Sequence, residues 1–528
     1  MEDKKYMYLK CLLVLLVAGS VFVEETAANV AADHNIVSGE VLVNVDAAQV
    51  KGDISTMLTG VNVSWYYDTD ELWANSGIAE NLRKIKAKLL RYPGGVETSK
   101  LHWETPYSHW NTDLWDPNIA PNKYPVDKKY MDTDDYIRQC RNIGAEPLIG
   151  INIQSGKKHN RLQDSINEAV RWVQYCKDKS YNVKYWYLDN EPYYKSNSEA
   201  MTAVEYAEYI RQFATAMEAV DPSIKIIIGW ENKLSVENYW NDWKLIIQKA
   251  GAYFDIADVH WYWAWGYATW DMWLHENPMR VREWCKECPD EKYIGPSFVD
   301  DIRGFYNKIK DVNGVSYDIK LAALEWNIAP VGGGRFSAFQ HALMRIWPDR
   351  NRQCLCRGRF SAFQHALMQS EMMMQFIDGG LYMACMWPLT WGGDLHGNFR
   401  TVLDQKKHKP TPTFEVFKLF SNVLGQRLIT TSANQAQIQS VSAVSCDGST
   451  VWVYLLHKSE HDQTITAKIA VDNFPAKDAQ AVVFTASRIS SNTSEVKSLN
   501  IVAADSNQWI VTLPPHSLTM VTFKKNKL

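Results

Sequence analysis

The sequence predicts an α/β protein, a (β/α)8 TIM barrel followed by a C-terminal antiparallel β-sandwich domain. Between residues 55 and 428, short apolar runs with strand character alternate with stretches whose apolar residues recur at helical spacing. Eight such pairs in one continuous span fit a closed barrel better than an open sheet. From residue 429 to residue 528 the helical spacing stops and short alternating strands replace it, which is typical of a small sandwich.

The eight strand candidates share one design, an apolar run that ends in polar or aromatic residues. Because the carboxyl ends of barrel strands build the active sites of this fold, we expect the functional residues there. The strands are predicted at 58–66, 88–94, 146–152, 184–190, 225–231, 255–263, 320–326 and 381–391. Helices are predicted at 71–88, 134–143, 162–180, 198–220, 236–250, 297–312, 363–377 and 413–428.

The N-terminus has the pattern of an export signal. Lys4, Lys5 and Lys10 precede an apolar run over residues 11–23, and small residues follow it. The run is too short to span a bilayer. We therefore expect residues 1–32 to be a signal peptide, the mature protein to be secreted or periplasmic, and residues 33–54 to supply a strand that joins the β-sandwich.

Composition narrows the class of partner. The net charge is −4 without a basic tract, so nucleic acid is not expected as a partner, and nothing after residue 32 is apolar enough to span a membrane. The 22 Trp and 26 Tyr exceed what packing needs, and their flat amphipathic rings suit sugars. The expected partner is a polysaccharide or oligosaccharide substrate, and the expected state is a monomer. The close pairs Cys285/Cys288 and Cys354/Cys356 favour no structural metal, because no second pair stands at zinc spacing.

One segment is duplicated. The decamer at residues 335–344 recurs identically at residues 359–368. Because a structural repeat would diverge in sequence, we interpret this as a recent tandem duplication or a sequence error. The second copy runs directly into the helix predicted at 363–377, so we assign that copy to the helix. The first copy is expected to form an irregular excursion.

Two carboxylates carry the predicted chemistry. The apolar run 185–188 ends in Asp189-Asn190-Glu191-Pro192, and the run 321–324 ends in Glu325. The ends of the fourth and seventh strands face one another across a barrel mouth, and a carboxyl pair there suits glycosidic bond cleavage. A separation of about 5–5.5 Å gives retention of configuration and about 6.5–9.5 Å gives inversion. This chemistry needs no metal and no cofactor, and we expect none. Asp189 and Glu231 are interpreted either as residues that support the catalytic side chains without touching substrate or as structural residues.

Asn190-Glu191-Pro192 with Glu325 resembles the retaining clan A-type (β/α)8 glycoside hydrolases, which include cellulases, arabinofuranosidases and β-agarases. The resemblance covers most of residues 55–428. It implies that Glu191 is the acid/base and Glu325 the nucleophile of a double displacement. It further implies substrate-binding or positioning roles for Arg91 beside the nucleophile, His260 and Tyr262 bonded to it, Asn190 at the sugar 2-hydroxyl, and Trp387 or Trp391 beneath the sugar.

The family within the clan depends on finer motifs. Residues 91–95 with Leu101-His102-Trp103 look like the arabinofuranosidase pattern, whereas Pro192 after Glu191 departs from it. With residues 150–156 and 387–393, the whole looks most like glycoside hydrolase family 86. This implies a secreted retaining endo-hydrolase that cleaves β-linked red-algal galactan, agarose or porphyran. The alternatives are an arabinofuranosidase or β-xylosidase of the same clan, and a non-catalytic carbohydrate-binding barrel.

A cluster of aromatic residues follows the sixth strand. We expect at least one of them to stack on a sugar and count Trp263 among the substrate-binding residues, while packing explains others. The cluster comprises Trp261, Trp263, Trp265, Tyr267, Trp270 and Trp273.

Overall fold

Eight parallel strands close into a barrel in this computed structural model. It describes residues 40–525 except 65–67, 106–112, 119–129, 195–199, 265–267, 285–291, 311, 313, 315–316, 330–359, 391–399, 405, 460–461 and 506. Apart from Glu40, the described residues belong to one compact unit that starts at Val41. The predicted signal peptide, the pairs Cys285/Cys288 and Cys354/Cys356, and the first copy of the decamer lie outside the described residues.

The barrel strands follow chain order around the ring. They are β2 (Gly60–Asn62), β3 (Leu89–Tyr92), β4 (Glu146–Ile151), β5 (Tyr185–Leu188), β6 (Lys225–Gly229), β7 (Ile256–Trp263), β10 (Lys320–Ile328) and β11 (Met383–Met386), and β11 pairs with β2 to close it. Each is almost entirely buried, because its apolar side chains fill the barrel on one face and contact helices on the other. Seven of the eight predicted strands contain one of these elements in full, and the remaining one, predicted at 320–326, ends two residues before β10 does.

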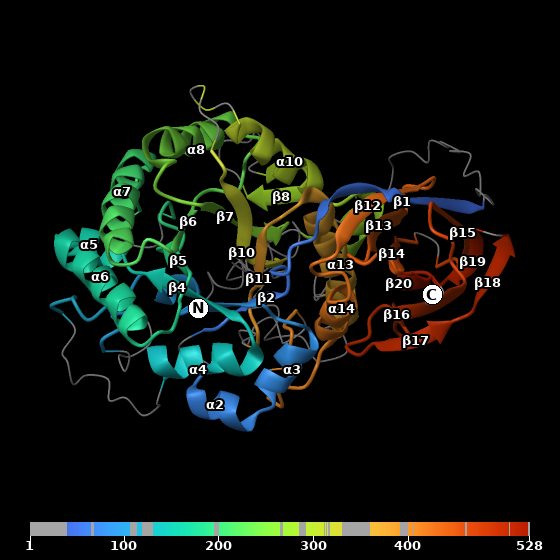
Figure 1. Cartoon of the computed structure of the whole chain (residues 1–528), viewed down its shortest axis with the longest axis horizontal. Helices are drawn as coiled ribbons and strands as arrows, with labels where there is room; N and C mark the ends of the chain where they lie inside the picture. Colours follow the sequence, from blue (N-terminus) through green and yellow to red (C-terminus); the bar gives the residue numbers. More distant parts are fainter. Residues whose placement is uncertain are drawn as a thin grey trace, which may run out of the picture. The chain divides into compact units, whose positions relative to one another are not determined.

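Helices surround the barrel strands (Figure 1). The larger ones are α4 (Thr133–Ile143), α6 (Leu162–Asp178), α7 (Ala203–Val220), α8 (Glu237–Ala250), α10 (Phe298–Ile309), α13 (Ala362–Gly379) and α14 (Pro412–Phe420). The helix predicted at 71–88 is instead two, α2 (Asp70–Asn75) and α3 (Ile78–Lys84). Gly77 lies between them with a φ of 72°, a left-handed conformation that ends one helix before the next begins.

The second copy of the decamer builds α13, as expected. Ser361 caps its N-terminus, with its hydroxyl accepting from the Gln364 amide and the Gln364 side chain accepting from the Ser361 amide. The helix is buried along most of its length because it lies between the barrel and strands of the C-terminal domain. The helix predicted at 413–428 is shorter than expected, since α14 ends at Phe420 and a strand begins at Arg427.

Shorter elements occupy the loops that follow the strands. They are η1 (Gly95–Glu97) after β3, α5 (Gln154–Lys158) after β4, and α9 (Trp270–His275) with the hairpin β8 (Arg280–Trp284) and β9 (Lys292–Ser297) after β7. The hairpin was not predicted, because charged residues interrupt its strands. Among the described helices, none has both the length and the apolarity to cross a bilayer.

The C-terminal domain is one ten-stranded sheet that encloses its own core. Its strands are β1 (Val41–Asp53), β12 (Arg427–Ala433), β13 (Ile438–Val444), β14 (Thr450–His457), β15 (Ile465–Asp472), β16 (Asp478–Thr485), β17 (Glu495–Leu499), β18 (Ile501–Asp505), β19 (Gln508–Leu513) and β20 (Ser517–Lys524). Strand β1 pairs antiparallel with β12 and parallel with β15, and the other pairs are antiparallel. Residues of strands far apart in the sheet, such as Val453 and Val511, share one core. The predicted fold class, a barrel with a C-terminal antiparallel domain, is confirmed.

Candidate active site

Glu191 and Glu325 reach the same end of the barrel by different local structures. Glu191 lies three residues beyond β5, whereas Glu325 lies inside β10, which continues to Ile328. The register of β10 against β7 changes between Ala322 and Glu325, where three steps along β10 oppose two along β7. Such a bulge changes the direction in which a side chain points.

The Glu325 carboxylate is buried and fully engaged. Arg91 Nη1 donates to its Oε1 at 2.7 Å and the Tyr262 hydroxyl donates to its Oε2 at 2.8 Å. Burial alone would raise the pKa of Glu325, but the positive charges of His260 and Arg91 and these two hydrogen bonds lower it. The lowered pKa favours the ionised form of Glu325, which is the form that its predicted role as nucleophile needs.

The Arg91 guanidinium connects three strand ends. Nη1 also donates to Asn62 Oδ1 at 2.9 Å, and Nη2 donates to Asn190 Oδ1 at 2.8 Å. Its carbon lies 4.4 Å from the centre of the Tyr187 ring. The planar fork of arginine suits this task, because it holds several acceptors in fixed directions. Asn62 was not among the predicted site residues, although it ends the first barrel strand.

His260 lies between the two glutamates. Its Nδ1 is 2.8 Å from Glu191 Oε1 and 3.7 Å from Glu325 Oε2, and its Nε2 is 3.2 Å from Asp258 Oδ2. Burial lowers the pKa of His260, but the charges of Glu325 and Asp258 outweigh it and raise the pKa to about 10. The ring is then protonated on both nitrogens and donates to Glu191 and Asp258. Asp258, a carboxylate within an apolar strand, was a signal that the sequence analysis missed.

The turn that carries Glu191 has an unusual backbone. Asp189 has a φ of 65° and Glu191 a φ of 43°, both in the left-handed region that residues other than glycine seldom adopt. Each such residue costs on the order of 1–3 kcal/mol, and the conformation persists only where the surrounding structure holds it. Asp189 and Asn190 are buried, and the Glu191 side chain is 24% exposed. Glu191 is thus held in one orientation at the mouth of the barrel.

One carboxylate oxygen of Glu191 and one of Glu325 lie within 4.8 Å of each other, and both within that distance of a His260 nitrogen. An oxygen–oxygen gap of this size is compatible with the separation of about 5–5.5 Å between carboxyl groups that act with retention. Three such ligand atoms could also hold a metal ion. However, His260 is protonated and Arg91 bonds Glu325 directly, so the group already contains the cations that neutralise it.

The aromatic residues predicted to contact sugar have different positions. Trp387 is partly exposed, and its ring edge packs over Gly94 and Gly95, where a Cβ would come within 3.2 and 3.1 Å of it. Trp263 has no exposed surface, so the expectation that it binds substrate is corrected: it lies in the hydrophobic core. Trp261 and Trp273 are also fully buried. Trp391, Trp265 and Tyr267 lie outside the described residues.

A buried carboxylic acid, Glu283, bonds the backbone of Tyr262. Glu283 of β8 accepts from the Tyr262 amide through Oε1 at 3.2 Å. Burial raises the pKa of Glu283 to about 8, against the opposing charge of Lys233. The hairpin β8–β9 thus contributes to the site through the backbone of β7, which sequence reasoning did not detect.

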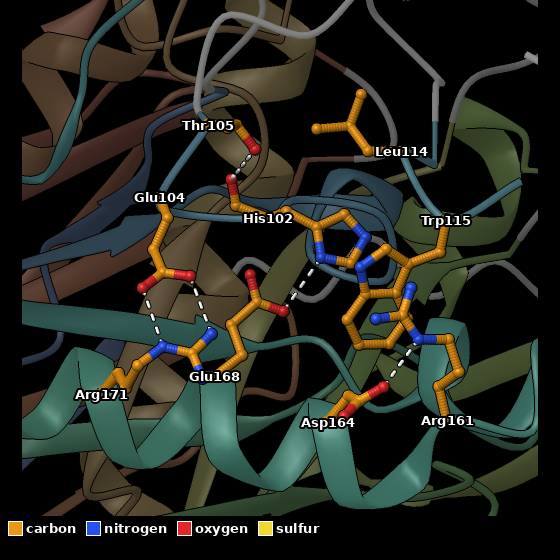
Figure 2. A pocket seen from close by; sticks show the side chains of 9 residues that line it. All are labelled: His102, Glu104, Thr105, Leu114, Trp115, Arg161, Asp164, Glu168 and Arg171. Atoms are coloured by element: carbon orange, nitrogen blue, oxygen red, sulfur yellow. Dashed lines mark hydrogen bonds and ion pairs between the residues drawn. The ribbon is translucent and has the colours of Figure 1, made fainter. Parts of the chain in front are cut away.

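A cavity of about 320 Å³ lies between the loop after β3 and helix α6. In Figure 2, His102 and Glu168 point toward each other, and Arg171 faces Glu104. The Arg171–Glu104 and Arg161–Asp164 contacts measure 2.8 and 2.7 Å, and Arg161 covers the Trp115 ring at 4.2 Å. Neither Glu191 nor Glu325 is among the lining residues, so this cavity is separate from the carboxylate pair.

Part of the sequence is similar to known arabinofuranosidases. A family model for the alpha-L-arabinofuranosidase 1 domain matches residues 81–265. Alpha-L-arabinofuranosidase C of Emericella nidulans is 29% identical over 188 residues, which are 32% of this chain and 35% of the relative. An intracellular exo-alpha-(1->5)-L-arabinofuranosidase of Acetivibrio thermocellus is 21% identical over 37% of this chain and 40% of its own length. The chain thus spans about a third of the length of the curated relatives it matches.

Solved structures match over the whole fold. The GH51 alpha-L-arabinofuranosidase from Thermotoga petrophila has a TM-score of 0.65 at 20% identity, covering 92% of this chain and 100% of that one. The enzyme from Thermotoga maritima, an arabinose complex, has a TM-score of 0.63 at 20% identity with the same coverage. A Paenibacillus polymyxa xyloglucanase of family 44 has a TM-score of 0.59 at 15% identity, again covering 92% and 100%. At these identities the likeness concerns the fold.

The predicted resemblance to family 86 was wrong. The sequence matches are to arabinofuranosidases. The predicted function on red-algal galactan, as an agarase or porphyranase, was therefore also wrong. The misleading features were Pro192 and the motifs at 150–156 and 387–393, which were given more weight than the motif at residues 91–103. That motif lies inside the matched region, so the sequence already contained the similarity to arabinofuranosidases that the comparisons found.

Proposed function

We propose that this protein is a retaining glycoside hydrolase that releases α-L-arabinofuranosyl residues, with Glu191 as acid/base and Glu325 as nucleophile. The observation that carries the proposal is the carboxylate pair, with oxygens within 4.8 Å of each other and with opposite surroundings. Glu325 is buried among cationic and hydroxyl donors, whereas Glu191 is partly exposed. The sequence similarity to arabinofuranosidases over residues 81–265 supports the substrate class.

In the first step Glu325 attacks the anomeric carbon while Glu191 protonates the departing glycosidic oxygen. His260 occupies Oε1 of Glu191 at 2.8 Å, so Oε2 is the atom that delivers the proton. The carbon–oxygen bond to the leaving group breaks as the ester bond to Glu325 forms. Tyr262 keeps its proton, because burial and the charge of Glu325 raise its pKa well above the usual value, and its hydroxyl steadies the attacking carboxylate.

In the second step water replaces the leaving group. Glu191, now without its proton, takes one from this water, and the hydroxyl oxygen attacks the anomeric carbon as the bond to Glu325 breaks. The product keeps the configuration of the substrate. Arg91 and His260 then neutralise the Glu325 carboxylate as it is released, which favours its departure.

The remaining predicted residues have roles in binding. Asn190 uses its Oδ1 for Arg91, which directs its Nδ2 as the donor for the sugar 2-hydroxyl. Trp387, seated over Gly94 and Gly95, offers a flat apolar surface beneath the sugar. These two contacts define the position of the sugar relative to Glu325.

The test uses the purified full chain with 4-nitrophenyl α-L-arabinofuranoside and arabinan, and with xylan and xyloglucan for comparison. We expect release of arabinose and, by proton NMR, initial formation of the α-anomer. Glu191→Gln and Glu325→Gln should each lower kcat by about 10³-fold or more with an unchanged melting temperature. Glu231→Gln, a carboxylate two residues beyond β6, is the matched control and should retain activity. Activity of either glutamine variant at the wild-type level would overturn the roles.

A further inference from the structure

We propose that Asp189 is a positioning residue for Glu191. Its buried carboxylate ties the turn 189–191 to the first turn of α5 and so fixes where Glu191 delivers its proton. This inference rests on the proposed function, because it assigns Asp189 a role through Glu191. Asp189 itself has no contact with Glu325 among the described hydrogen bonds and ion pairs.

Five donors converge on the Asp189 carboxylate. The amides of Ile153 and Gln154 donate to Oδ2 at 2.9 and 2.6 Å. The Ser99 hydroxyl, the Gln154 side chain and the Asn190 amide donate to Oδ1 at 2.5, 3.2 and 2.7 Å. Each oxygen therefore faces donors only, which suits an ionised carboxylate and no neutral side chain.

Further hydrogen bonds hold the backbone of Asp189 and Asn190, the two residues before Glu191. The Gln154 side chain also donates to the Asn190 carbonyl at 3.0 Å, and the Asp189 amide donates to the Ile151 carbonyl at 2.9 Å. The chain between Asp189 and Glu191 is thus fixed at one amide and one carbonyl. Because Asp189 and Glu191 both have left-handed φ angles, the turn needs such fixation to persist.

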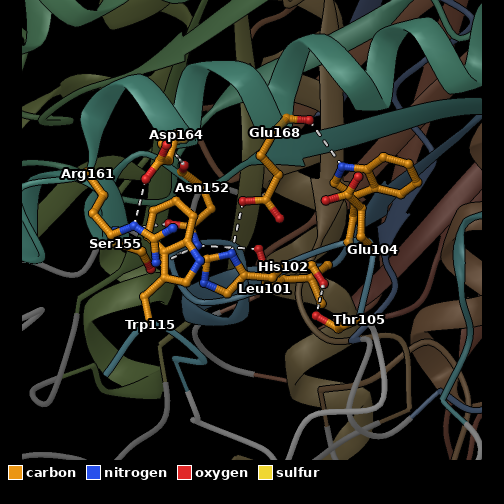
Figure 3. A network of polar contacts seen from close by, with 12 residues as sticks. Leu101, His102, Glu104, Thr105, Trp115, Asn152, Ser155, Arg161, Asp164 and Glu168 are labelled. Carbon is orange, nitrogen blue, oxygen red and sulfur yellow. Dashed lines mark hydrogen bonds and ion pairs between the residues drawn. The ribbon is translucent and has the colours of Figure 1, made fainter. Parts of the chain in front are cut away.

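The anchor, α5, is itself held in place. Asn152 and Ser155 bond each other across the start of α5, with Asn152 Nδ2 2.9 Å from Ser155 Oγ and the Ser155 amide 3.1 Å from Asn152 Oδ1. The Ser155 hydroxyl lies 2.8 Å from Asp113 Oδ2, and Asp113 Oδ1 is 3.2 Å from His102 Nε2. Figure 3 shows Asn152 and Ser155 beside His102. Asp189 therefore connects Glu191 to a continuous buried network.

The test compares substrates by leaving group. Expulsion of an alcohol such as methanol needs a proton from Glu191, whereas 2,4-dinitrophenolate leaves without one. The variant Asp189→Asn keeps the side-chain volume but places an NH2 group against donors. We expect its kcat/KM to fall by about 10- to 100-fold on methyl α-L-arabinofuranoside and by less than about 3-fold on the 2,4-dinitrophenyl substrate. Glu191→Gln serves as the benchmark for this discrimination.

Two controls separate positioning from general destabilisation. Glu371→Gln alters another buried, multiply bonded carboxylate and should affect both substrates equally. Gln154→Met removes the side-chain bonds to Asp189 and Asn190 but leaves the amides, and should shift the ratio of the two substrates in the same direction as Asp189→Asn. If Asp189→Asn does not fold, the substrate ratio of Gln154→Met alone tests the positioning role of Asp189.

Azide gives a second readout. It attacks the glycosyl-enzyme without general base help, so the ester bond to Glu325 breaks and arabinosyl azide forms. Azide should accelerate Asp189→Asn on the dinitrophenyl substrate and leave the wild type unchanged. Equal losses on both substrates, with no azide effect, would overturn the positioning role. If the wild type cleaves neither substrate, the proposed function fails instead.

Discussion

Arg91 and Glu325 form a buried ion pair at the centre of the barrel mouth. Nη1 lies 2.7 Å from Oε1, and the side chains are 0% and 8% exposed. Desolvation of two charges is costly, and a buried pair contributes little net stability. Its value here lies in the ionisation of Glu325, because Arg91 together with His260 keeps the pKa of a buried carboxylate below its ordinary value.

Arg91→Met should therefore impair both activity and its pH dependence. Without the guanidinium the pKa of Glu325 rises, so the acidic limb of the kcat/KM profile should move to higher pH and kcat should fall by about 10²-fold or more. Arg91→Lys keeps the charge but lacks the fork that reaches Asn62 and Asn190. Its kcat and the position of its acidic limb should therefore lie between those of the wild type and Arg91→Met. An Arg91→Met profile with an unmoved acidic limb would contradict this account.

The pair His102–Asp113 should stabilise the fold only within a pH window. Burial lowers the pKa of His102, but its bonds to Asp113 and Glu168 outweigh this and raise it from 6.5 to about 9. A raised histidine pKa contributes stability that is complete below about pH 6.5 and is lost as pH rises through about 9. The pKa of Asp113 is lowered despite burial, chiefly by His102, so its contribution is lost in acid.

Urea unfolding of the wild type and His102→Gln at about pH 6, pH 7.5 and pH 9.5 measures this contribution. The rise in the pKa of His102 corresponds to about 3 kcal/mol of stability. The difference in the free energy of unfolding between the wild type and His102→Gln should therefore be largest at about pH 6 and shrink toward pH 9.5. His275→Gln is the control, because the His275 side chain is 57% exposed. A difference that does not change with pH would show that His102 contributes only by packing.

The sequence predicted most of the barrel because its strands carry their own signal. Runs such as Ile226-Ile227-Ile228 of β6 are apolar and buried throughout, since both faces of a parallel barrel strand are buried. Glu191 and Glu325 were found because each follows such a run. Asn62 and Glu283 were missed because their roles depend on neighbours distant in sequence, Arg91 and the Tyr262 amide. Asp258 was missed although its partner His260 is two residues away on the same strand. Trp263 was misassigned because periodicity along β7 does not reveal which face meets the helices.

Removal of the duplicated segment should leave the fold intact. Deleting residues 335–358 leaves one copy of the decamer, joined directly to α13. The contacts of the helix start then persist, namely Ser361 Oγ to the Ile489 carbonyl at 2.7 Å and the Ala362 amide to Asn492 Oδ1 at 3.0 Å. We expect the melting temperature of the deletion variant to stay within about 3 °C of the wild type, and its rate in the assay of the proposed function to equal or exceed the wild-type rate. Failure of this variant to fold would mean that the extra 24 residues are part of the structure.

Glu371 of α13 and Lys458, just after β14, form an ion pair between the barrel and the C-terminal sheet. Both side chains are fully buried. Lys458 Nζ lies 2.9 Å from Glu371 Oε2 and 4.8 Å from the centre of the Trp273 ring. Glu371 also accepts from Trp273 Nε1 and the Met279 amide, each at 2.6 Å. The carboxylate therefore has partners on α9, on the segment before β8 and just after β14, and a single change leaves an uncompensated charge.

A double-mutant cycle tests this contact. Glu371→Gln and Lys458→Met should each lower the free energy of unfolding by about 3–5 kcal/mol, because each leaves a buried side chain without its counter-charge. The double variant should be less destabilised than the sum of the two, since it removes both charges together. Denaturant unfolding followed by tryptophan fluorescence measures the coupling, with Lys497→Met, which removes an exposed Glu495 pair, as the control. Additive losses would show that Glu371 acts mainly through Trp273 and Met279 and that the ion pair contributes nothing of its own.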